Sequence, residues 1–181
     1  MEISRSQLIP LIPEDKLVSI VQQLAKAIDQ DYQGTDALVI IGVLKGSFIF
    51  LADLIRLIQT PIRAIEFMKL SSYGDSTISS GQALMQLGVT EAMLAKQHVL
   101  LVEDIVDTGV TMSMTLQYLQ QYQPASLRLC TLLDKPSRRK VPVQIDYVGA
   151  IVPDQFIVGY GIDYNEKYRQ LPAIYGLVED P

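Results

Sequence analysis

Residues 99–111 read Val-Leu-Leu-Val-Glu-Asp-Ile-Val-Asp-Thr-Gly-Val-Thr, the most informative stretch of the chain. An apolar run typical of a buried strand ends at two adjacent acids, Glu103 and Asp104. A third acid, Asp107, follows, and then the turn 108–111 opens an amphipathic helix. Acids at the end of a buried strand are costly unless they are solvated, paired or bound to a ligand. The stretch therefore predicts a binding site at the carboxyl end of a sheet.

The turn after Asp107 has the composition of an anion-binding nest. Gly109 permits a positive φ, so successive backbone N–H groups can converge on one anion at a positive helix N-terminus. An ordinary helix N-cap is the alternative, because Asp and Thr are common cap residues, and a salt-bridged loop edge is the alternative for Glu103 and Asp104. Vicinal ribose hydroxyls are donors that neighbouring carboxylates can accept. Together the two features favour a ligand that carries hydroxyls and a phosphate, such as a phosphorylated ribose.

The composition fits one compact enzyme domain. The chain has 181 residues, 49% hydrophobic and 19% charged, with a net charge of −5 that argues against a nucleic-acid binder. An acidic protein that binds phosphates needs backbone donors or a metal ion. The apolar runs are too short to span a membrane, and the N-terminus lacks the apolar core of a signal peptide, so we expect a cytoplasmic protein. The single cysteine, Cys130, reads as a buried strand thiol.

Strand-like and helix-like patterns alternate along the chain, which predicts an α/β fold with a mainly parallel sheet flanked by helices. We expect helices beginning at Pro13 and ending before Gly34, over 48–58, and over about 111–122. We expect strands over 37–43, 62–70, 98–102, 126–133, 147–152 and 156–160. The 48–58 helix is apolar nearly all round, so it should be buried in the core or against a second subunit. The long polar stretch 71–88 has the character of a lid.

The segment 103–111 resembles the phosphoribosyl pyrophosphate signature of the type I phosphoribosyltransferases. The acid at position 107 resembles the hypoxanthine-guanine branch. Three more segments resemble family motifs in the right order: a pyrophosphate loop at 43–48, a purine-side segment at 134–143, and a base-binding part at 154–169. The resemblance implies one domain over 1–181 with a core of about 35–135, a hood built from the termini and a flexible lid at 71–88. The family often has a cis peptide before the loop lysine, here between Leu44 and Lys45.

The resemblance also implies the roles of the residues around the ribose. Asp107 would act as general base or proton acceptor beside purine N7. The 5′-phosphate would be held by Thr108, Gly109 and Thr111. The ribose hydroxyls would be held by Glu103 and Asp104, directly or through Mg²⁺.

A second group of implied residues handles pyrophosphate and base. Lys45 and Gly46 would contact pyrophosphate through backbone groups, and Arg169 would pair with it. Lys135 would donate to the 6-oxo oxygen of the purine, since an ammonium has only donors. Phe156 would stack on the base, and the Ile157 backbone would meet its 2-position edge. The remaining implied roles are metal binding by Asp163 and lid closure by Ser72 and Tyr73. His98 lies away from every motif and reads as structural.

The resemblance implies purine salvage: transfer of the 5-phosphoribosyl group from phosphoribosyl pyrophosphate to N9 of hypoxanthine or guanine, giving IMP or GMP and pyrophosphate. Magnesium is the implied cofactor, and a homodimer or homotetramer the implied assembly. Relatives acting on adenine, orotate or uracil usually lack an acid at the Asp107 position and an equivalent of Lys135. A regulator with this fold would tend to lose the base or gain a basic face. The choice among hypoxanthine, guanine and xanthine stays open.

Overall fold

The computed structural model describes residues 7–69 and 89–178. The elements in chain order are β1 (Gln7–Ile12), α1 (Glu14–Asp31), β2 (Leu38–Leu44), α2 (Phe48–Ile55), β3 (Ile62–Lys69), α3 (Glu91–Leu94), β4 (His98–Val106), α4 (Val110–Gln120), β5 (Ser126–Asp134), the 3-10 turn η1 (Pro136–Arg138), β6 (Tyr147–Ile151), β7 (Phe156–Val158) and β8 (Ile174–Val178). The predicted lid 71–88, with Ser72 and Tyr73, lies outside the described residues. No helix in the described ranges is long and apolar enough to cross a membrane.

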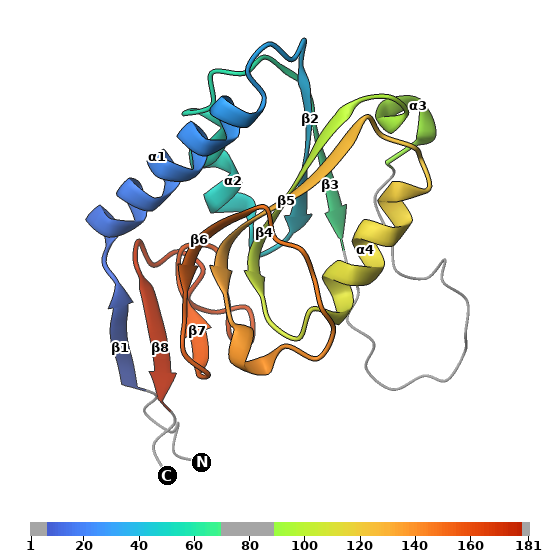
Figure 1. Ribbon diagram of the computed structural model, residues 1–181. Helices are drawn as coiled ribbons and strands as arrows, with labels where there is room; N and C mark the ends of the chain where they lie inside the picture. Colours follow the sequence, from blue (N-terminus) through green and yellow to red (C-terminus); the bar gives the residue numbers. More distant parts are fainter. Residues whose placement is uncertain (1–6, 70–88, 179–181) are drawn as a thin grey trace.

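A five-stranded sheet in the order β3-β2-β4-β5-β6 forms the centre of the molecule. All of its neighbouring strands pair in parallel, which confirms the expected α/β architecture. Figure 1 shows α1 and α2 on one face of this sheet and α3 and α4 on the other. Because the strands are parallel, the loops after β2, β4 and β5 all leave the same end of the sheet.

Side chains on alternate positions of each strand enter two separate cores. The core under α1 and α2 takes one set from β2, β4 and β5: Leu38, Ile40, Leu100, Val102, Cys130 and Leu132. The core under α3 and α4 takes the other set: Val39, Ile41, Val43, Val99, Leu101 and Leu129. Cys130 is fully buried as expected, and its burial raises the pKa of the thiol. Apolar side chains on both faces explain why these strands read as continuous apolar runs.

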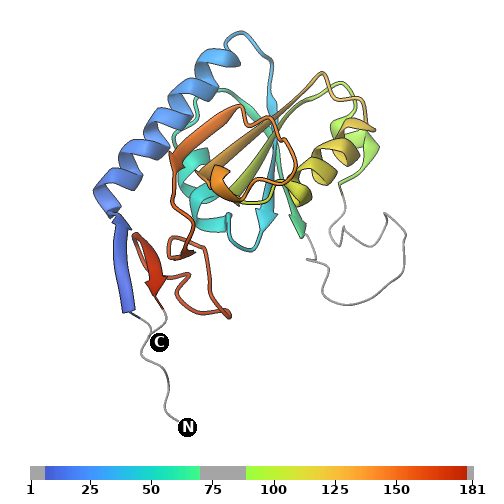
Figure 2. The same ribbon diagram turned by 60° about the horizontal axis from the view of Figure 1, so that its bottom comes forward.

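A second, smaller sheet in the order β1-β8-β7 joins the two ends of the chain. Its strands are antiparallel, and Gln7 pairs with Val178. In Figure 2 this sheet lies to one side of the parallel sheet, beside its carboxyl end. We call β1, β7 and β8 the hood. Neither β1 nor β8 was expected from the sequence, because each is a strand only through a partner at the far end of the chain.

Two further expectations need correction. The strand predicted over 98–102 continues to Val106, so Glu103 and Asp104 lie inside β4 instead of after it. The helix predicted over 48–58 ends at Ile55, and only part of it is buried. Phe48 stays 44% exposed, because α2 covers the sheet with a single face.

Candidate active site

A pocket of about 450 Å³ opens at the carboxyl ends of β2 and β4. Its walls come from the end of β2 and the following loop, the end of β4, and the turn into α4. The predicted site residues among its walls are Gly46, Glu103, Asp104, Asp107, Thr108, Gly109 and Thr111. The structure therefore brings together residues from two loops that are about sixty positions apart in the chain.

The loop after β2 lies directly against β4. The Leu44–Lys45 peptide is cis, as the family resemblance implies. A Cβ atom on Gly46 would lie 1.6 Å from Asp104 Oδ2, so any larger residue would force this carboxylate to move. The Gly46 backbone also lies close to the C-terminal part of the chain: a Cβ atom on Gly161 would lie 2.2 Å from the Gly46 carbonyl oxygen. Close approach of a carboxylate thus explains glycine at position 46, and close approach of backbone explains it at position 161.

Glu103 and Asp104 form an acidic pair at the floor of the pocket. Glu103 is 8% exposed, and its Oε1 accepts a hydrogen bond from the Asp104 backbone N–H at 2.9 Å. Burial and the neighbouring Asp104 carboxylate raise the pKa of Glu103 well above its usual range. A ligand that brings hydroxyl donors or a cation to the pair would relieve this repulsion.

The turn after β4 has the conformation that an anion nest requires. Gly109 has φ 81°, in the left-handed region, and α4 begins at the next residue. A Cβ atom on Gly109 would lie 2.4 Å from the Val141 carbonyl oxygen. The Val110 N–H has only a long contact of 3.4 Å with Thr108 Oγ1, so side-chain capping leaves the N–H groups of this turn available to a ligand.

Two arginines without a role predicted from the sequence, Arg138 and Arg139, hold Asp107. Arg139 Nε donates to the Asp107 carbonyl oxygen at 3.0 Å, and its Nη2 is paired with Asp134. Arg138 Nη1 lies 3.6 Å from Asp107 Oδ2. The other carboxylate oxygen, Asp107 Oδ1, is buried and makes no hydrogen bond within the described part of the chain. A buried acceptor without a donor is what a proton-bearing ligand would complete.

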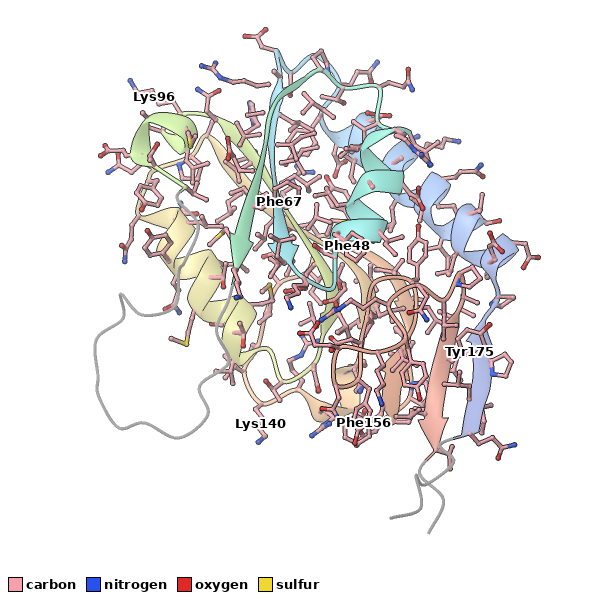
Figure 3. The ribbon with its side chains drawn as sticks, turned by 180° about the vertical axis from the view of Figure 1, so that it is seen from behind. Phe48, Phe67, Lys96, Lys140, Phe156 and Tyr175 are labelled. Atoms are coloured by element: carbon pink, nitrogen blue, oxygen red, sulfur yellow. The ribbon has the colours of Figure 1, made fainter. Side chains whose placement is uncertain are left out.

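The predicted base-binding residues lie at the border between β5 and the hood. Lys135 is 5% exposed, and its Nζ donates to the Gln155 carbonyl oxygen at 2.8 Å. This is one acceptor for three donors. Phe156 follows Gln155 and is 58% exposed, with its ring against Tyr164 at a centroid distance of 5.6 Å. Ile157 is buried beneath it. Figure 3 shows Phe156 at the end of the molecule toward which β2 and β3 point.

An ion-pair network at the C-terminal segment holds the predicted pyrophosphate residues. Arg169 Nη2 pairs with Asp163 at 2.7 Å and with Glu166 at 3.2 Å. Glu166 also pairs with Lys45 Nζ at 2.8 Å. Hydrogen bonds from Lys45 and Arg169 lower the pKa of the Glu166 carboxyl. Glu166 was missed from the sequence, where an acid in this stretch gives no local signal.

The acids fit a magnesium ion that arrives with its substrate. Glu103, Asp104 and Asp163 do not form one three-ligand cluster in the described structure. Asp163 is already engaged by Arg169, and its Oδ2 accepts the Glu166 N–H at 2.8 Å. In phosphate sites Mg²⁺ commonly takes one or two carboxylates together with substrate oxygens. The donor set fits that mode, and it does not fit an all-protein cage.

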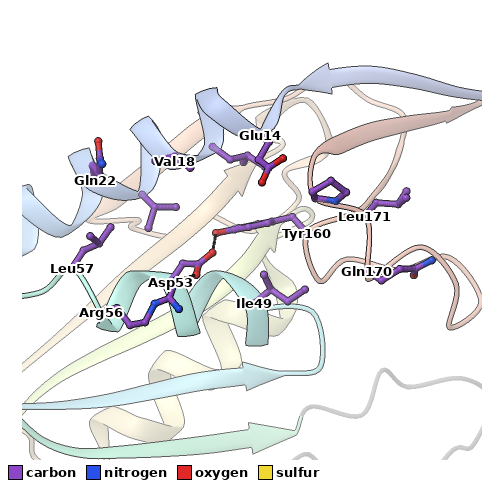
Figure 4. A pocket seen from close by; sticks show the side chains of 13 residues that line it. Glu14, Val18, Gln22, Ile49, Asp53, Arg56, Leu57, Tyr160, Gln170 and Leu171 are labelled. Carbon is purple, nitrogen blue, oxygen red and sulfur yellow. Dashed lines mark hydrogen bonds and ion pairs between the residues drawn. The ribbon is translucent and has the colours of Figure 1, made fainter.

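A second pocket of about 530 Å³ lies between α1, α2 and residues 160–172. None of the predicted site residues lines it. The Tyr160 hydroxyl donates a hydrogen bond to Asp53 Oδ2 at 2.6 Å across its floor (Figure 4). This bond ties the C-terminal segment to α2, the helix that follows the Gly46 loop.

Comparison with known proteins gives consistent results. Residues 13–165 match the family model described as phosphoribosyl transferase domain. The chain is 44% identical to the hypoxanthine-guanine phosphoribosyltransferase of Aquifex aeolicus, with 99% of each chain covered. It is 42% identical to the hypoxanthine phosphoribosyltransferase of Salmonella typhimurium over 91% of this chain and 92% of the relative. A crystal structure of a hypoxanthine-guanine phosphoribosyltransferase from Bacillus anthracis has a TM-score of 0.84 and 44% identity, covering 93% of this chain and 98% of that one.

Proposed function

Because the chain belongs to the phosphoribosyl transferase family, we propose that it is a purine salvage enzyme. It transfers the 5-phosphoribosyl group from phosphoribosyl pyrophosphate to N9 of hypoxanthine or guanine and releases pyrophosphate. The relatives named for this activity match over nearly the whole chain, which supports the assignment. The observation that carries it is Asp107, whose buried Oδ1 has no partner among residues 7–69 and 89–178 and lies beside an anion nest and an acidic pair.

The pocket accounts for binding of the ribose phosphate. The backbone N–H groups and hydroxyls of residues 108–111 would hold the 5′-phosphate at the N-terminus of α4. Glu103 and Asp104 would accept the ribose hydroxyls and stabilise positive charge that develops on the ribose as pyrophosphate leaves. Gly46, Lys45 and Arg169 would hold the pyrophosphate. Magnesium, bound through substrate oxygens and one or two of Glu103, Asp104 and Asp163, would neutralise the pyrophosphate charge.

The hood side accounts for selection of the base. The Lys135 ammonium has unused donors and no acceptor. It would donate a hydrogen bond to a 6-oxo oxygen, and it has no acceptor for the 6-amino group of adenine. Phe156 would stack on the ring, and the Ile157 backbone would meet the 2-position edge. Asp107 Oδ1 would take the proton that the base loses, because the attacking N9 becomes more nucleophilic when that proton has an acceptor. The proposal also includes closure of the lid 71–88 over the site, with Ser72 and Tyr73 reaching the bound substrates.

Two coarser features complete the proposal. We place the enzyme in the cytoplasm, because phosphoribosyl pyrophosphate is a highly charged metabolite that does not cross membranes unaided. We also expect a homodimer or homotetramer. Figure 3 shows Phe48 of α2 and Phe67 of the edge strand β3 on the same side of the molecule, and both rings are exposed. Sedimentation velocity measures the assembly directly.

The test is an assay of phosphoribosyl pyrophosphate and magnesium with hypoxanthine, guanine, xanthine and adenine in parallel. We expect turnover of one or more 6-oxopurines and none of adenine. Lys135→Met should raise KM for the 6-oxopurine while KM for phosphoribosyl pyrophosphate changes little. If no 6-oxopurine reacts, the proposal is wrong, and binding without turnover would instead favour a regulator.

A further inference from the structure

Glu166 holds two cations that come from distant parts of the chain. Its Oε1 accepts from Lys45 Nζ at 2.8 Å, and its Oε2 accepts from Arg169 Nη2 at 3.2 Å. Lys45 belongs to the loop after β2, whereas Arg169 lies beyond the hood strand β7. The mechanism proposed above uses the Lys45 backbone and the Arg169 guanidinium, and it gives Glu166 and the Lys45 ammonium no part.

The backbone places this carboxylate firmly. Asn165 and Glu166 have φ values of 52° and 62°, in the left-handed region that side-chain-bearing residues rarely adopt. The Glu166 N–H is bonded to Asp163 Oδ2 at 2.8 Å, and Tyr164 and Lys167 form an isolated bridge around the turn. The turn therefore directs the Glu166 carboxylate toward the two cations.

Arg169 is the cation proposed above to pair with pyrophosphate, and the shared carboxylate of Glu166 holds the Lys45 ammonium beside it. A carboxylate that lies within hydrogen-bond distance of both occupies donors that phosphate oxygens would use, and it repels an incoming polyanion. Arg169 Nε is buried and makes no hydrogen bond in the described residues, so Arg169 has donor capacity beyond its two carboxylate partners. Lys45 and Arg169 therefore have more donors than the Glu166 carboxylate can use, and an anion with more oxygens, such as pyrophosphate, could use them.

We propose that Glu166 is an internal competitor for the pyrophosphate subsite. Its carboxylate pairs with both Lys45 and Arg169, and it releases the two cations when pyrophosphate or phosphoribosyl pyrophosphate binds. Glu166 therefore sets the affinity of the protein for both of these ligands. This inference rests on the proposed function. The Glu166 and Lys45 side chains are 65% and 53% exposed, so water and salt screen the pair and the effect is a tuning of affinity rather than a block.

The test is titration calorimetry of inorganic pyrophosphate with Glu166→Gln, which keeps the side chain's size and removes its charge. Exposed ion pairs change equilibria by factors of about 1.4 to 5 each. We therefore expect the Kd for pyrophosphate to fall about three- to tenfold. KM for phosphoribosyl pyrophosphate should fall in parallel, and KM for the purine should not change. The matched control is Glu91→Gln, which makes the same change of net charge on the exposed surface of α3 and should leave Kd unchanged.

A magnesium-free titration separates a direct effect from one transmitted through Asp163. We expect the gain in affinity with and without magnesium, because the competition is between anions. A gain seen only with magnesium, an unchanged Kd, or weaker binding by Glu166→Gln would overturn the proposal. Wild-type protein that turns over phosphoribosyl pyrophosphate but shows one of these outcomes refutes only the role of Glu166. Wild-type protein that neither turns over nor binds pyrophosphate refutes the proposed function as well.

Discussion

The two ends of the parallel sheet both carry charged and aromatic clusters, but the charge pairing of one cluster is complete within the described residues and that of the other is not. At the amino end, Arg128 donates to the Tyr147 hydroxyl at 2.6 Å and pairs with Asp31, which also accepts from Tyr147 at 2.9 Å. The Arg128 guanidinium lies 5.0 Å from the centre of the Tyr32 ring. His98, read as structural from its position, is bonded there to a serine hydroxyl.

The carboxyl end has the same kinds of side chain with gaps in their partnerships. Asp107 Oδ1 has no donor in the described structure, and Lys135 has a single acceptor. Glycine replaces side chains at the points of closest approach, Gly46 and Gly109. The comparison teaches that charge density does not mark the functional end of this sheet. Unfilled hydrogen-bonding capacity on charged groups marks it, since only the neutral Tyr32 hydroxyl lacks a partner among the buried side-chain atoms described at the amino end. The complete cluster serves stability.

The largest effect expected at the incomplete end is that of Asp107→Ala. Removing a general base costs about 10²–10⁴-fold in rate. The melting temperature should change little, because Oδ1 makes no hydrogen bond within the described residues and the 3.6 Å contact of Oδ2 with Arg138 is partly exposed. The checks are a coupled assay of nucleotide formation and thermal denaturation. Activity equal to that of the wild type would exclude the proposed role of Asp107.

Gly46→Ala tests whether close approach at the carboxyl end serves the ligand. Its Cβ would displace the Asp104 carboxylate from the pocket floor, so we expect KM for phosphoribosyl pyrophosphate to rise about tenfold, at an overpacking cost of about 1–3 kcal/mol. Gly34→Ala is the control: Gly34 has φ 80° near the amino end, with nothing within 4 Å of its added Cβ. It should lower stability and leave KM unchanged. Equal effects on KM from both changes would remove the distinction between the ends.

Glu103→Gln should make the protein more stable at high pH while lowering activity. Burial raises the pKa of Glu103 in the folded state, so between its unfolded and folded pKa the unfolded chain ionises first and wild-type stability falls as pH rises. Glutamine has no such loss. The variant's melting temperature should match the wild type at about pH 4 and exceed it by pH 8, by about 2–4 °C for each kcal/mol recovered. Melting curves across this range decide it, and a difference independent of pH would speak against ionisation as the cause.

The smallest effect belongs to the complete cluster. Arg128→Met should cost about 1 kcal/mol, lowering the melting temperature by about 2–4 °C, because the pairing with Asp31 is partly exposed. The kinetic constants should stay at wild-type values. A changed kcat or KM would show that the two ends of the sheet are coupled.

Much of the central sheet is legible in the sequence, since buried parallel strands leave long apolar runs such as 38–43 and 98–102. The hood is not. Gln7–Ile12 contains Pro10, and it becomes a strand only beside Ile174–Val178. Local patterns carry no information about a partner at the other end of the chain. The four-residue helix α3 is likewise too short to show a period.

The site divides in the same way. The segment 103–111 announces its chemistry, because acids, glycine and threonines lie together in sequence. Arg139 and Glu166 do not, because each acts through residues far along the chain, on the Asp107 carbonyl and on Lys45. The roles of such charged residues can be recognised only once their tertiary contacts are known.

The pairing of β1 with β8 orders events during synthesis. While a chain grows on the ribosome, β1 is made first, but its pairing partner β8 is made last. Every strand of the parallel sheet has been made by Ile151. We therefore expect the ribose-phosphate half to assemble first on the nascent chain, with the purine half following once β7 and β8 have been made. A chain stalled after β6 would hold Asp107 and Lys135 without Phe156 and Arg169, so it would have the ribose-phosphate pocket and lack side chains for stacking on the purine and for pairing with pyrophosphate.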